Sequence, residues 1–175
     1  IYMAQISNLD KKYDPAIEPT RELYNEYFGG GMNSIVFQEM RETRGLAYSA
    51  WASIMPPSYL KYPYVLRTQI ATQNDKMIDA VTTFNDIINN MPESEAAFKL
   101  AKDGLTNRLR TERIIKGDII WSYINAQDLG QNVDPRIKLY NDIQNMSLKD
   151  IVDFQKQWVK GRTYVYCILG DKKDL

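Results

Sequence analysis

Short β-like runs and longer helical stripes alternate along the 175 residues, and their order is the strongest constraint on the fold. The β-like runs, rich in β-branched and aromatic side chains, cover residues 1–7, 48–55, 64–72 and 164–169. Apolar residues recur at helical spacing within residues 20–28, 34–45, 75–91, 94–116, 118–129 and 147–158. Without the additional helices the order is βαββαβ, the split-βαβ pattern. We therefore expect an α+β fold: a mixed, mainly antiparallel sheet of about four or more strands with helices packed on one face.

Turn and capping residues mark the ends of these elements. Asn8, Asp10 and Pro15 predict a turn directly after the first strand, and Asp134-Pro135 predicts a loop. The glycines that follow Phe28 predict a helix end with a left-handed C-cap. Side chains that predict helix starts are Asp75, Ser94 and the capping box of Ser147 and Asp150.

Composition excludes several classes of function. The chain has no His and one Cys, so it holds no Ser–His or Cys–His catalytic pair, no His-ligated zinc and no internal disulfide. Lys and Arg number 22 and so do Asp and Glu, which gives no basic excess for nucleic acid or an anionic membrane. Cys167 lies within an apolar strand run, so we expect a buried structural thiol.

The chain carries no apolar run of about 18 residues, so we expect no membrane span. It starts inside one apolar run at Ile1 and stops soon after another, which indicates a fragment cut from a longer chain. We expect one domain over residues 1–175. A leader could lie upstream of the fragment, so a periplasmic, secreted or cytoplasmic location stays open.

The glycine run Gly29-Gly30-Gly31 precedes a predicted helix, where a phosphate could bind. No Gly-Lys-Ser/Thr follows it, and it follows a helix rather than a strand, so it is neither a P-loop nor a dinucleotide motif. A flexible connection between two helices is the simpler interpretation.

The most informative stretch is residues 27–50, with the sequence YFGGGMNSIVFQEMRETRGLAYSA. It resembles the pitrilysin/insulinase family of zinc metallopeptidases, including the mitochondrial processing peptidase branch. Members of this family carry a similar glycine loop, a helix of the type Gln-Glu-x-Arg-Glu-x-Arg, and Gly-Leu-Ala-Tyr-Ser. The stretch belongs to the half of the enzyme that does not hold zinc. The order of the remaining elements is compatible with such a half over nearly the whole chain.

The resemblance implies roles for particular residues. An Arg late on this helix and a Tyr seven positions later reach the bound peptide near the scissile bond, and they correspond to Arg41 and Tyr48. A guanidinium and a phenol are donors that can hold a carbonyl oxygen as it becomes an oxyanion. Gly30 and Gly31 are assigned to substrate binding. Arg44 lies on the same helix but not at the matching position.

The resemblance also implies what this segment lacks. The family's zinc motif is His-x-x-Glu-His, and a chain without His cannot form it. We therefore expect no cofactor in this segment, with zinc supplied by a lobe in the same chain or in a partner subunit. The implied function is the substrate-holding half of a two-lobed metalloendopeptidase that acts on peptides. The alternative is an inactive scaffold or assembly subunit of the same family, which would have no need of Arg41 and Tyr48.

The 12 Tyr and 3 Trp are numerous for a segment that must meet another lobe. We expect a face or an edge of this domain to be unusually apolar or aromatic.

Overall fold

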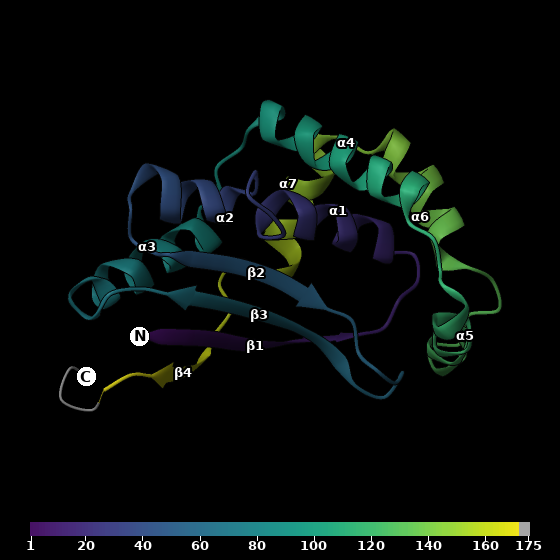
Figure 1. Cartoon of the computed structure of the whole chain (residues 1–175), viewed down its shortest axis with the longest axis horizontal. Helices are drawn as coiled ribbons and strands as arrows, with labels where there is room; N and C mark the ends of the chain where they lie inside the picture. The colour runs from purple at the N-terminus through teal and green to yellow at the C-terminus, as the bar shows by residue number, and fades with distance from the viewer. Residues whose placement is uncertain (172–175) are drawn as a thin grey trace.

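The structure is a computed structural model, and it describes residues 1–171. Its strands form a single four-stranded sheet in the order β2-β3-β1-β4. Every neighbouring pair in this sheet is antiparallel. The strands are β1 (Tyr2–Lys12), β2 (Ser49–Met55), β3 (Pro63–Ala71) and β4 (Val165–Leu169). The expected α+β fold is confirmed, and β2 and β3 form a hairpin (Figure 1). The sheet was expected to be mixed, but all of its strand pairs are antiparallel.

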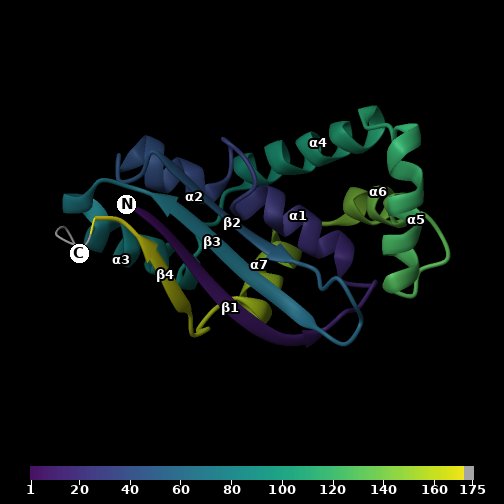
Figure 2. The same cartoon turned by 60° about the horizontal axis from the view of Figure 1, so that its bottom comes forward.

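The helices lie on one face of the sheet and leave the other face open, as Figures 1 and 2 show together. The α-helices are α1 (Glu18–Phe28), α2 (Ile35–Phe37), α3 (Met77–Asn89), α4 (Glu95–Thr111), α5 (Ile119–Asp128), α6 (Pro135–Asn145) and α7 (Leu148–Trp158). A π-helix, η1 (Gln38–Thr43), continues α2, and two short 3-10 turns are η2 (Asn74–Lys76) and η3 (Lys116–Asp118).

Alternation along β1 explains which face is covered. Met3, Gln5, Ser7 and Leu9 are buried beneath the helices. The residues between them point to the open face, because successive side chains of a strand alternate. The aromatic side chains of α1 fill the layer between helices and sheet, and Tyr24, Tyr27 and Phe28 are fully buried there.

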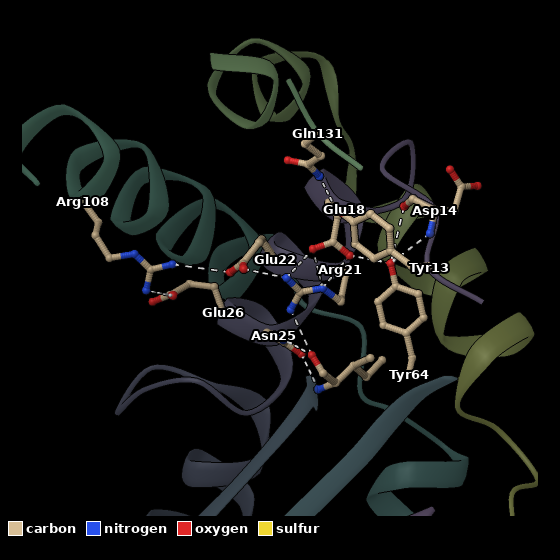
Figure 3. Close-up of polar contacts among 11 residues, drawn as sticks. Tyr13, Asp14, Glu18, Arg21, Glu22, Asn25, Glu26, Tyr64, Arg108 and Gln131 are labelled. Atoms are coloured by element: carbon tan, nitrogen blue, oxygen red, sulfur yellow. Dashed lines mark hydrogen bonds and ion pairs between the residues drawn. The ribbon is translucent and has the colours of Figure 1, made fainter. Parts of the chain in front are cut away.

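A buried ion-pair network ties α1 to the sheet, as Figure 3 shows. The Arg21 guanidinium lies 2.7 Å from carboxylate oxygens of both Glu18 and Glu22 and donates to the Ile54 carbonyl oxygen at 2.9 Å. Tyr64 of β3 donates to Glu18 Oε1 at 2.6 Å. Burial raises the pKa of Tyr64, so its phenol stays a donor. The network matters because a buried guanidinium is tolerated only when it is paired and hydrogen-bonded.

Two predictions made from polar and proline residues are wrong. The first strand does not end at residue 7 but runs to Lys12, since Asp10 takes a φ of 52° in an irregular stretch of the β1–β3 ladder. The loop predicted at Asp134-Pro135 is the start of α6. The Asp134 side chain caps this helix and Pro135 occupies its first turn, where a missing N–H costs nothing.

Some of the predicted helix caps are present in the structure and others are not. Ser94 accepts from the Ala97 N–H at 3.2 Å, and the capping box of Ser147 and Asp150 is present. Asp75 is not a cap, because it lies inside η2. The N-cap residue of α3 is Lys76, which makes no side-chain capping bond. Gly29 does end α1, but with a φ of −140°, outside the left-handed region. A glycine is required at this position for a steric reason, because β2 passes too close to leave room for a side chain.

Candidate functional site

A π-helical turn positions the first predicted site residue. The Ser34 side chain accepts from the Phe37 N–H and caps α2, which then widens into η1 at Gln38. Single π-helical turns within helices are frequent at functional sites, because the extra residue re-aims the side chains of the turn. Arg41 lies in this turn, with its side chain about half exposed.

The chain reverses directly after η1 and delivers the second site residue. The Met40 carbonyl oxygen accepts from the backbone N–H groups of Leu46 and Ala47, and Gly45 takes a φ of 58°. This conformation is easy for a glycine, which has no Cβ to clash with the backbone. Tyr48 follows, and its N–H donates to the Ala71 carbonyl oxygen at 2.8 Å, so it is fixed beside the end of β3.

Arg41 and Tyr48 meet in space. The guanidinium carbon of Arg41 lies 5.6 Å from the centre of the Tyr48 ring and 5.0 Å from the centre of the Phe37 ring. Both distances are within the range of a cation–π contact. Tyr48 is 81% exposed, so its phenol can reach a ligand in solution.

The pair borders a cavity of about 540 Å³, a volume typical of ligand sites. The lining consists of Ile1, Tyr2, Arg41, Gly45, Leu46, Ala47, Tyr48, Ala71, Thr72, Gln73 and Lys76. Lys76 donates from Nζ to the Gly45 carbonyl oxygen at 3.1 Å, and Thr72 donates from Oγ1 to the Leu46 carbonyl oxygen at 2.6 Å. Thr72, directly after β3, and Lys76, directly before α3, thus hold the loop that carries Tyr48.

The other predicted residues lie elsewhere. Gly30 and Gly31 are absent from the cavity lining. A Cβ on Gly30 would lie 2.8 Å from the Asn25 carbonyl oxygen, whereas one on Gly31 would meet nothing within 4 Å. Arg44 is also outside the lining, and its Nε lies 3.5 Å from Glu39. The roles of Gly30 and Gly31 in substrate binding stay predictions, and Arg44 was expected to have none.

Sequence reasoning missed Lys76 and Thr72. They reach the cavity because β3 pairs with both β1 and β2, and a ladder between segments distant in sequence leaves no local motif. The positive charge of Lys76 within a short polar stretch was the only sequence signal.

The described residues form neither a metal site nor a helix that could span a membrane. Within residues 1–171, no three or more His, Cys, Asp and Glu side chains gather as a metal site would require. No helix in this part of the chain is long and apolar enough to cross a membrane.

Apolar and aromatic side chains are exposed on several surfaces, as expected, and α5 and the open face of the sheet are two of them. Helix α5 contributes no buried residue, and its Trp121 and Tyr123 are 64% and 62% exposed. On the open face of the sheet, Tyr2 and Leu169 are opposite one another and exposed. Cys167 was expected to be buried, but it is exposed, because it pairs with Ala4 on the open face of the sheet and β4 is an edge strand.

Known proteins share this fold. A family model described as the peptidase M16 inactive domain matches residues 9–105. The non-peptidase homolog YmxG of Helicobacter pylori is 27% identical over 152 residues, which cover 83% of this chain but 34% of that protein. The chain therefore spans only a minor part of this curated relative's length.

Two solved structures have a similar fold. The peptidase M16 inactive domain from Pseudomonas fluorescens has a TM-score of 0.70 at 17% identity, over 94% of this chain and 40% of that one. An inactive peptidase domain from Bordetella parapertussis has a TM-score of 0.74 at 12% identity, over 98% of this chain and 93% of that one.

The family match spans more than half of the chain and includes α1, η1, β2 and β3, together with Arg41 and Tyr48. The resemblance to the non-zinc half of pitrilysin/insulinase peptidases is thereby confirmed. The chain belongs to the family of peptidase M16 inactive domains.

Proposed function

We propose that this chain is the substrate-holding half of a two-lobed zinc metalloendopeptidase. The observation that carries the proposal is the meeting of Arg41 and Tyr48 at one cavity, with the guanidinium carbon 5.6 Å from the phenol ring. The described residues do not fit a zinc site, so zinc chemistry is assigned to another lobe, in the same chain or in a partner subunit.

The two side chains offer a peptide fixed hydrogen-bond donors. The guanidinium has several N–H groups, and the phenol has one O–H. A peptide carbonyl oxygen gains negative charge while its carbon is attacked, and donors already in place stabilise that charge without reorganising. The rings of Phe37 and Tyr48 restrict the Arg41 guanidinium, so its donors are held before the peptide arrives.

The exposed apolar surfaces favour the presence of a second lobe that covers them. Helix α5 and the open face of the sheet carry large apolar side chains that the described residues do not cover. Patches of this kind usually mark contacts with another protein surface.

An inactive scaffold of the same family is the alternative, and one observation favours it. The Helicobacter pylori relative is described as a non-peptidase homolog. A scaffold would use the fold and its apolar surfaces but would place no demand on the donors of Arg41 and Tyr48.

Peptide turnover by the complete protein that carries this chain distinguishes the substrate-holding half of a peptidase from the inactive scaffold. An internally quenched peptide should be cleaved, and Arg41→Ala and Tyr48→Phe should each lower kcat/KM by about 100-fold, or about 3 kcal/mol, while zinc content stays the same. Arg44→Ala is the matched control, since Arg44 lies in the same region but outside the cavity. A folded, zinc-loaded protein without peptidase activity would favour the scaffold.

A further inference from the structure

We propose that the cavity beside Arg41 and Tyr48 contains a carboxylate-binding subsite, in which Lys76 and Arg41 select peptides that carry a carboxylate close to the bound segment. The inference rests on the proposed function and deepens it by naming the class of peptide. It also gives Lys76 a role in specificity in addition to its bond with the Gly45 loop.

The charges around the cavity are the first observation. Arg41 and Lys76 both line it, and no Asp or Glu within residues 1–171 is part of the lining. The carboxylate beside Arg41 is that of Glu42, 3.6 Å from Arg41 Nε and 53% exposed. An ion pair this exposed is weak, so it leaves the guanidinium available to a ligand. Among the described residues, the cavity therefore presents two cationic side chains and no carboxylate in its lining.

The free donors are the second observation. Lys76 uses one N–H in its 3.1 Å bond to the Gly45 carbonyl oxygen, and an ammonium group has three. That bond also restricts where the ammonium lies, which lowers the entropy lost when it binds a ligand. Lys76 directly precedes α3, a helix of 13 residues whose N-terminal end adds a partial positive charge.

The walls of the cavity are the third observation. Leu46, Ala47 and Ala71 give it apolar sides. Attraction between unlike charges is stronger beside apolar walls than in open water, because less water screens it. A volume of about 540 Å³ has room for a peptide segment with an acidic side chain.

A carboxylate can come from an internal Asp or Glu or from the C-terminus of a peptide. Four fluorescent peptides of one unfolded sequence separate these sources: Asn or Asp at one position, each with a C-terminal amide or a free carboxylate. Fluorescence anisotropy with this chain gives the dissociation constant of each. We expect at least one carboxylate peptide to bind about tenfold more tightly than the neutral peptide, because charged hydrogen bonds are stronger than neutral ones. The preference for the carboxylate peptide should become smaller as the salt concentration rises.

The Lys76→Gln variant tests the residue itself. Glutamine keeps a donor for the Gly45 carbonyl oxygen but removes the charge, so the affinity ratio of carboxylate to neutral peptide should fall to about one. Lys76→Arg should retain a preference. The matched control is Lys99→Gln, an exposed lysine of α4 that is not in the cavity lining, and it should keep the full ratio.

The outcomes separate the two proposals. Equal affinities for all four peptides, or an undiminished ratio in Lys76→Gln, overturn the subsite. If the neutral peptide binds and Arg41→Ala weakens its binding, the proposed function stands without the subsite. If no peptide binds, or if binding is indifferent to Arg41→Ala, the proposed function itself fails.

Discussion

Gly29 at the end of α1 lies against the backbone of Ala52 in β2, with no space between them for a side chain. A Cβ built on Gly29 would lie 2.2 Å from the Ala52 carbonyl oxygen and 2.5 Å from the Ala52 nitrogen. This contact brings α1 onto the strand that begins beside Tyr48, so the glycine loop has a structural role close to the site.

We predict that Gly29→Ala destabilises the fold by about 2 kcal/mol or more, because backbone must move to accept the methyl group. Gly31→Ala is the matched control. A Cβ there would meet nothing within 4 Å, so the change should be neutral or stabilise by up to about 1 kcal/mol. Denaturant unfolding of both variants checks this, and similar stabilities for the two would contradict the close approach.

Trp121 and Trp158, two of the three tryptophans, should differ sharply in their contribution to stability. Trp158 is 7% exposed, stacks on Phe154 with centroids 5.0 Å apart and meets Tyr64 edge-on. Trp158→Ala should cost about 3–5 kcal/mol through the cavity that it leaves. Trp121→Ala on α5 should change stability by no more than about 0.5 kcal/mol. A large loss at Trp121 would mean that α5 is packed against the rest of the chain.

Tyrosine ionisation should set the alkaline limit of stability. Burial raises the pKa of Tyr13 and of Tyr164 to about 12 in each case. An unfolded tyrosine ionises near pH 10, so the unfolded state loses its protons first. The free energy of unfolding should therefore hold steady below about pH 10 and fall as the pH rises from there towards 12.

Tyr164→Phe isolates one of these groups. The Tyr164 hydroxyl is buried and has no hydrogen-bond partner among the described residues, so its removal should stabilise the chain at neutral pH by about 1 kcal/mol. The variant should also lose less stability between pH 10 and 12. Unfolding curves at several pH values measure both effects, and an unchanged alkaline slope would speak against a raised pKa at Tyr164.

The isolated chain should retain no stoichiometric zinc. The described residues offer no group of ligands, and the sequence has no His. Metal analysis after dialysis, with thermal unfolding in the presence and absence of a chelator, should show neither bound zinc nor a shift in Tm. One tightly held zinc per chain would place the metal site here after all.

Much of the fold is readable from the sequence because its signals are local. Apolar spacing located α1, α3, α4, α5 and α7, and β-branched and aromatic runs located the four strands. The helix α6 was missed because Asp134-Pro135 was interpreted as a loop, although an N-cap side chain followed by proline is equally a helix start. The length of β1 was missed because one irregular stretch at Asp10 carries the strand through a polar segment.

For the site too, the residues within a local motif could be predicted from the sequence and the others could not. Arg41 and Tyr48 lie within one continuous motif, so the sequence could place them together. Lys76 and Thr72 join them only through the pairing of β3 with its neighbours, and no local pattern predicts that register. The exposure of Cys167 follows from the place of β4 at the sheet edge, which its apolar sequence does not reveal.

The most direct test of the central claim is the affinity of a neutral, unfolded peptide for this chain and three variants. Arg41→Ala and Tyr48→Phe each remove donors from the cavity, and each should raise the dissociation constant about tenfold, the equivalent of about 1.4 kcal/mol. Arg44→Ala, outside the cavity, should leave it unchanged. Equal affinities for the wild-type chain and the Arg41 and Tyr48 variants, or a larger loss at Arg44, would contradict the account.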